Sequence, residues 1–125
     1  WADYGGLSLC YVPMPAPMKP TSVFGRRLRA ARKALGMSQA DLGAILGLED
    51  ANSAAPRISR YELGQRDPDP ATTEALAKAL GVPAAYFHAT SDVMAEAILL
   101  LSQLTVEQQK AAVTALKKQV AKAKG

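Results

Sequence analysis

Residues 26–48 read RRLRAARKALGMSQADLGAILGL, and residues 57–69 read RISRYELGQRDPD. In both stretches apolar residues recur at intervals of three and four, the spacing of an α-helix with one buried face. Ser38 stands where a helix can begin, and Asp41 follows three residues later, as in a capping box. A glycine follows each apolar run, as is common where helices end. The two stretches therefore predict short helices packed around one core.

The same spacing predicts five helices between residues 21 and 90 and indicates an all-α fold. Thr21 or Ser22 can cap the first helix. Asp69 followed by Pro70 is a strong start signal for the fourth. No run in this region alternates with a period of two, so no strand is expected. The expected helices cover residues 22–35, 38–47, 53–63, 70–80 and 83–88.

The apolar positions of the second and third helices predict which residues reach the core. Leu42, Ile45 and Leu46 are expected to face inward from the second helix. Ile58 and Leu63 are expected to fix the third helix to the same core, and the third helix is expected to begin with Ser53 as its cap.

Residues 91–125 predict two further helices that form a C-terminal helical hairpin. Thr105 and Gln108 make a second capping-box pattern, so the chain should break and restart there. The hairpin either packs onto its own domain or dimerises. The apolar run at residues 98–101 favours dimerisation, because a helix that is apolar on most sides needs burial from two directions. The predicted dimerisation residues are Ile98, Leu101, Val106, Val113, Leu116 and Val120.

Residues 1–20 predict a flexible, proline-rich N-terminal extension. Four of these residues between Pro13 and Pro20 are prolines, and that density can continue neither a helix nor a central strand. Met14 and Met18 are plausible natural starts, so we expect the residues before them to be an upstream-translated extension. An ordered N-terminal arm is the alternative.

Basic residues concentrate in one part of the chain. The whole chain has 15 basic and 11 acidic residues and a net charge of +4. Residues 22–66 hold eight basic and four acidic residues, whereas residues 67–90 hold one lysine and three acidic residues. Two clusters of arginine on either side of a turn between helices are typical of proteins that contact DNA phosphates.

The chemistry of the side chains excludes several classes of protein. With a single cysteine, Cys10, the chain has no internal disulfide framework, and with a single histidine, His88, we expect no metal and no cofactor. No apolar run approaches the roughly 18 residues of a membrane span. His88 and Asp92 are expected to meet at a helix end and not as a catalytic dyad. We expect a cytoplasmic protein that is not an enzyme.

The helical pattern resembles the lambda-repressor-like (XRE-type) helix-turn-helix family over residues 22–90. The resemblance rests on Gly36-x-Ser38-Gln39, on Ile58-Ser59-Arg60-Tyr61-Glu62 and on Ala79-Leu80-Gly81-Val82. It implies a five-helix DNA-binding domain whose third helix enters the major groove while the second braces it. The implied partner is a double-stranded DNA operator, and the implied source is a bacterium or a phage. The implied function is that of a transcription regulator, most simply a homodimeric repressor of an inverted repeat.

The resemblance also assigns roles to individual residues. Arg60 is expected to read a base, because arginine can form two hydrogen bonds with guanine, and Arg57 is expected to contact a base or a phosphate. Arg32 and Glu62 resemble a structural ion pair of the family. The predicted DNA-binding residues are Ser38, Gln39, Ala55, Pro56, Arg57, Ser59, Arg60, Gln65, Arg66, Arg27 and Arg29.

One departure from the family pattern affects the predicted contacts. Ten residues lie between Gly47 and Ile58, more than the family commonly has, so either the turn or the start of the third helix is longer. An alternative function is an antitoxin-like or anti-repressor module that binds a partner protein through the C-terminal helices. The arginines of the third helix favour DNA binding over that alternative.

Overall fold

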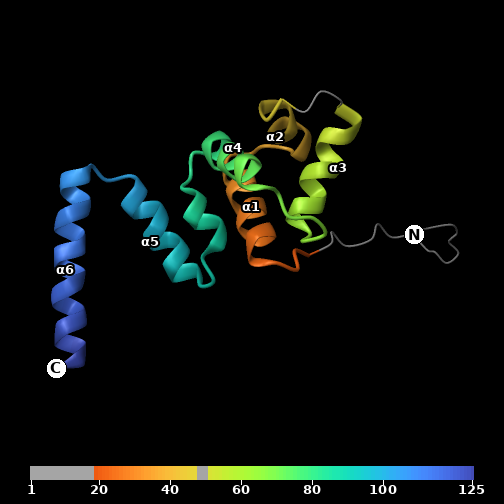
Figure 1. The fold of residues 1–125 in the computed structure, drawn as a ribbon. Coiled ribbons are helices and arrows are strands. Elements are labelled where there is room, and N and C mark those ends of the chain that lie inside the picture. The colour runs from red at the N-terminus through yellow and green to blue at the C-terminus, as the bar shows by residue number, and fades with distance from the viewer. Residues whose placement is uncertain (1–18, 48–50) are drawn as a thin grey trace, which may run out of the picture.

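A computed structural model describes residues 19–47 and 51–125, and the described residues contain helices and no strand. The all-α fold class predicted from the sequence is therefore confirmed. In Figure 1 the first four helices form one group, and the last two lead away from it. The elements are α1 (Val23–Ala34), α2 (Gln39–Ile45), α3 (Ala51–Glu62), α4 (Pro70–Leu80), the 3₁₀ helix η1 (Ala84–His88), α5 (Asp92–Ser102) and α6 (Val106–Lys124).

Most helices begin at the caps that the sequence predicts. The Ser22 hydroxyl accepts a hydrogen bond from the Gly25 backbone N–H at 2.9 Å. Asp69 accepts one from the Thr72 N–H at 2.7 Å at the start of α4, where Pro70 is the first helical residue. These bonds satisfy backbone donors that have no partner inside the helix. At the other end of α4, Gly81 adopts the left-handed conformation with φ 69°.

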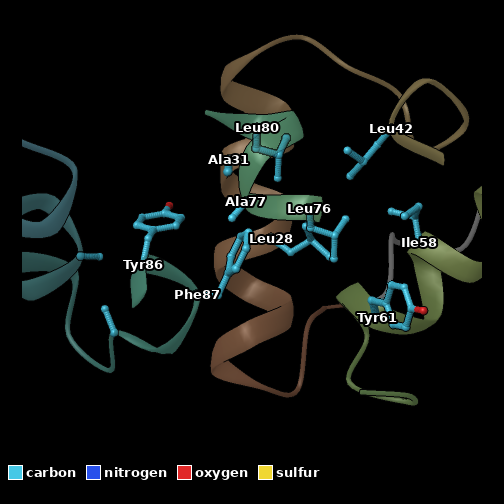
Figure 2. Close-up of a cluster of buried hydrophobic side chains, with 12 residues drawn as sticks. Leu28, Ala31, Leu42, Ile58, Tyr61, Leu76, Ala77, Leu80, Tyr86 and Phe87 are labelled. Carbon is cyan, nitrogen blue, oxygen red and sulfur yellow. The ribbon is translucent and has the colours of Figure 1, made fainter. Parts of the chain in front are cut away.

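The core lies between α1, α2, α3, α4 and η1, as Figure 2 shows. Its largest apolar side chains have no exposed surface: Leu28, Leu42, Ile58, Leu76 and Phe87. Burying side chains of this size contributes about 1.5–3 kcal/mol each. The Phe24 and Phe87 rings lie 4.9 Å apart and join α1 to η1. The core therefore fixes α3 relative to the rest of the domain through Ile58.

The structure corrects three expectations for α2 and α3. Ile45 is 58% exposed, because Leu42 and Gly43 occupy the side of α2 that meets the core. Ser53 does not cap α3, since the helix already begins at Ala51. Leu63 is only half-buried. The extra residues after Gly47 thus extend the start of α3 in part, whereas residues 48–50 lie outside the described residues.

Helices α5 and α6 form the C-terminal pair, and they diverge from the turn that joins them (Figure 1). Helix α5 rests on η1, with Ala95 buried and Ile98 and Leu99 packed against the core. The predicted capping box is present, since Thr105 and Gln108 exchange hydrogen bonds at the start of α6. No residue of α6 is buried. Across the described residues, no helix combines the length and hydropathy needed to cross a membrane.

Candidate nucleic-acid interface

Helices α2 and α3 pack closely against each other, so that α2 braces α3. Gly43 of α2 faces Ala54 of α3, and a Cβ atom on Gly43 would lie 2.6 Å from the Ala54 Cβ. Both residues are buried. Only glycine permits this approach of the two backbones. The position of α3 is thus fixed from one side by α2 and from the other by the core.

The outer face of α3 carries four of the residues predicted to bind DNA, namely Ala55, Pro56, Ser59 and Arg60. Helical spacing places Pro56 and Arg60 on one face, four residues apart, and both are exposed. Ser59 and Ala55 lie beside them and are half-buried. Pro56 lies inside α3 and not at its start as expected, because the helix begins earlier. An exposed helical face with an arginine at its centre fits the major groove.

Arg57 lies on the flank of α3 that faces α4. It is exposed and lines a shallow groove of about 210 Å³ together with Leu46, Tyr61, Ala71, Thr72 and Ala75. A side chain in this position lies away from the centre of the outer face. Arg57 thus lies farther from the centre of the outer face than Arg60, and the base and phosphate contacts expected for the two arginines stay predictions.

Glu62 joins α3 to both neighbouring helices from inside the domain. Its carboxylate has no exposed surface and accepts hydrogen bonds from Arg32 Nε at 2.6 Å and Arg32 Nη2 at 3.1 Å. Arg29 Nε donates to it at 3.0 Å and Gln39 Nε2 at 3.2 Å. The ion pair expected between Arg32 and Glu62 is thus present and has two further donors. A fork of arginine donors suits a carboxylate in a fixed position.

Burial alone would raise the pKa of Glu62, because it disfavours the charged form. The hydrogen bonds from Arg32, Arg29 and Gln39 outweigh burial and hold the pKa of Glu62 below its ordinary value of 4.5. A carboxyl group whose pKa is lower in the folded state than in the unfolded state stabilises the fold. This contribution is fully present above the unfolded-state pKa, and it disappears as the pH falls through the folded-state pKa.

We therefore expect the free energy of unfolding to fall as the pH decreases below about 4.5. The free energy of unfolding of the Glu62→Gln variant should fall less steeply over the same pH range, because this variant has one fewer carboxylate to protonate. Urea unfolding monitored by circular dichroism at pH 3 to 7 measures both slopes. Equal slopes for the two proteins would show that Glu62 does not titrate below its ordinary value.

Two arginines of α1 lie inside the domain and not at its surface. Arg27 is 6% exposed and donates to the Ala89 carbonyl and the Asp92 carboxylate. The Arg29 side chain is 19% exposed and pairs with Glu62. Both placements argue against the phosphate contacts expected for them. A sequence signal was available for Arg27, which is spaced three and four residues from the apolar Phe24 and Ala31 and so shares their buried face.

The start of α2 is occupied by groups of the protein itself. Ser38 is exposed and forms the predicted capping box, in which Asp41 accepts the Ser38 N–H at 3.0 Å. This hydrogen bond from the backbone lowers the pKa of Asp41. The side-chain amide of Gln39 donates a hydrogen bond to the Glu62 carboxylate. The carboxylate of Asp41 competes with a phosphate at this position, so the contacts expected at Ser38 and Gln39 stay predictions.

The turn after α3 is exposed and carries the last two residues predicted to bind DNA. Gln65 and Arg66 are both exposed. The Gln65 N–H donates to the Arg60 carbonyl at 2.9 Å, which fixes where the chain leaves the helix. Both residues therefore follow the C-terminal end of α3 directly, and the DNA contacts expected for their side chains stay predictions.

Asp92 has a partner that the sequence did not indicate. It pairs with Arg27 at 2.8 Å and not with His88, the partner expected at this helix end. The His88 ring instead lies 5.9 Å from the Phe24 ring. A partner 65 residues away cannot be read from local spacing. Within the described residues, no group of histidine, cysteine or acidic side chains could hold a metal ion.

Comparison with known proteins identifies the region that contains α2 and α3 as a helix-turn-helix. A family model described as helix-turn-helix (HTH_3) matches residues 28–87, which include all of α2, α3 and α4. A solved structure described as "Crystal structure of transcriptional regulator BswR" is 42% identical in sequence, and the match covers 81% of this chain and 98% of that chain with a TM-score of 0.69. The curated proteins contain no match to the sequence.

Proposed function

This chain belongs to the lambda-repressor-like helix-turn-helix family of DNA-binding transcription regulators, and on that premise we propose that it acts as a homodimeric repressor of an inverted-repeat operator. The observation that carries this proposal is the outer face of α3, which presents Arg60 from a helix held by α2 and by the core. One such helix fits one major groove, and two related by a two-fold axis fit two half-sites.

Within this proposal the exposed residues have different tasks. Arg60 reads a base edge from the centre of the outer face, with Pro56 and Ser59 beside it. Arg57 and Arg66 contact phosphates on either side, which fixes the register of the helix without reading sequence. Repression follows if the bound dimer blocks polymerase from the same DNA. The protein would work in the cytoplasm, at the nucleoid.

The exposed apolar face of α6 supports the homodimer. Val106, Val113 and Val120 are 64%, 43% and 53% exposed, and Leu116 between them is 50% exposed. An isolated helix of this kind is marginal in water without packing on its apolar face. Residues spaced by seven along one face suit a second copy of the same helix, and a two-fold interface uses the same face twice. We propose that α6 and the exposed part of α5 supply this interface.

Arg60→Ala is expected to weaken binding to the cognate site by about 1–3 kcal/mol and to relax specificity at one base pair. The reason is the loss of two hydrogen bonds to a base edge. Titration of labelled duplexes at fixed salt measures both effects, with a cognate and a random sequence compared.

The matched control is Lys78→Ala, which removes an exposed cation from α4 away from the outer face of α3. It should leave the ratio of cognate to random affinity unchanged. If Arg60→Ala weakened binding to cognate and random DNA equally, Arg60 would be a phosphate contact and the base-reading role would be wrong.

A further inference from the structure

The junction between η1 and α5 is held to α1 by a buried arginine. Arg27 Nε donates to the Ala89 carbonyl at 3.0 Å, and Arg27 Nη1 donates to the Asp92 carboxylate at 2.8 Å. Ala89 is the C-cap residue directly after η1, and Asp92 is the first residue of α5. One guanidinium group thus binds both sides of the point where the chain turns toward the C-terminal helices.

Two neighbours complete this contact. Arg26 Nη2 donates to the Thr90 carbonyl at 3.3 Å, on the exposed side of the junction. The Tyr86 ring lies 6.0 Å from Cζ of Arg27. Consecutive arginines of α1 therefore bind consecutive positions of the junction. We call this set the junction clasp, and it consists of Arg26, Arg27, Ala89, Thr90 and Asp92.

The clasp determines geometry more than it contributes stability. Asp92 is 88% exposed at its side chain, and ion pairs with an exposed partner contribute little to stability. Nη2 of Arg27 is buried without a hydrogen-bond partner among the described residues, which is costly for a charged group. A planar guanidinium with donors in fixed directions nevertheless restricts how its acceptors lie. Apolar packing of Ala95, Ile98 and Leu99 holds α5 to the domain, and the clasp fixes the chain at the base of the helix.

A small change in the direction of α5 displaces the far end of that helix, and with it the start of α6, by several ångströms. Helix α5 has 11 residues and is therefore about 16 Å long at 1.5 Å per residue. A rotation of about 12° at its base moves its far end by about 3.4 Å, which is one base-pair step of DNA. Helix α6 starts beyond that end and has no buried residue to restrain it.

We infer that Arg27 is a positioning residue that sets the direction of α5 and, through the dimer, the separation of half-sites that the protein accepts. This inference rests on the proposed function, because it requires the homodimer to form through the C-terminal helices. It gives Arg27 a role in operator selection without contact to DNA. Specificity for the length of the spacer would then be determined at the junction clasp, and specificity for bases at the outer face of α3.

The test is a panel of inverted repeats in which the spacer between half-sites changes by one base pair at a time. Asp92→Asn removes the charge of the carboxylate that pairs with Arg27 and keeps the size of the side chain, and Arg27→Lys keeps the charge but loses the fork of donors. Glu96→Gln is the matched control, because Glu96 is exposed on the same helix and forms no ion pair within the described part of the chain. Affinity for an isolated half-site is measured in parallel.

For the wild type and Glu96→Gln we expect a change of one base pair to cost about tenfold in affinity, because DNA or protein must deform. For Asp92→Asn and Arg27→Lys we expect a loss of about threefold or less across the same step, with half-site affinity unchanged. Spacing profiles equal to that of the wild type in both variants would overturn the inference. A wild type that bound the repeat no better than a half-site would overturn the proposed homodimer itself, and the inference with it.

Discussion

Replacing Glu62 with alanine is expected to lower the free energy of unfolding by about 3–5 kcal/mol, the range for removing one partner of a buried ion pair. Glu62 has no exposed surface, and its carboxylate is the common acceptor for Arg32, Arg29 and Gln39. Without it, the guanidinium of Arg32 stays buried and loses the charge that compensates it. Total stability of a domain of this size is about 5–15 kcal/mol, so the loss would be a large fraction.

Urea unfolding followed by circular dichroism measures this effect at pH 7. Glu96→Ala is the matched control, since it removes an exposed glutamate from α5, and it should change the unfolding free energy by less than about 0.5 kcal/mol. A Glu62→Ala protein within about 1 kcal/mol of the wild type would show that the buried network does not hold α3 to α1 and α2.

Removing α6 is expected to lower affinity for an inverted repeat by about 100-fold or more, because the second half-site would lose its high effective concentration. The chain should end at Gln103, since Ala95, Ile98 and Leu99 of α5 pack against the core and have to be kept. The DNA-binding domain should then fold as a monomer. Its affinity for an isolated half-site should stay within about threefold of the wild type.

The truncation also removes positive charge, which needs a control of its own. Helix α6 carries five lysines, and lost phosphate contacts would weaken binding to any DNA. Val113→Ser combined with Leu116→Ser disrupts the exposed apolar face and keeps every lysine. Sedimentation and DNA titration at one salt concentration compare the three proteins. A truncated chain that still sediments as a dimer would contradict the role of α6, and a full-length monomer would favour a different protein as its partner.

The helices were predictable because their signals are local. Caps such as Ser22 and Asp69 satisfy backbone donors within three residues, and a left-handed glycine such as Gly81 closes the helix that precedes it. Signals of this kind do not depend on the rest of the fold. The start of α3 was predicted two residues too late, because Ser53 is a good cap residue and yet lies within the first turn.

The direction of charged side chains was only partly predictable. Sequence alone shows that α1 is rich in arginine, and a basic cluster is most simply interpreted as a surface for phosphate. The structure places Arg27 and Arg29 inward, because Asp92 and Glu62 supply carboxylates from helices that are distant in sequence. Arg60 differs, because it follows the exposed period of its own helix. Helical spacing indicates that Arg27 faces inward, but it cannot identify a partner such as Asp92 that lies on another helix.

The most direct test of the central claim is selection of bound sequences from a pool of random duplexes, using the full chain. A homodimer that reads DNA through α3 predicts a two-fold symmetric consensus with half-sites about one helical turn apart, near 34–36 Å. Arg60→Ala should lose preference at one symmetric pair of positions in that consensus. No enriched sequence, or an enriched sequence without two-fold symmetry, would contradict the account.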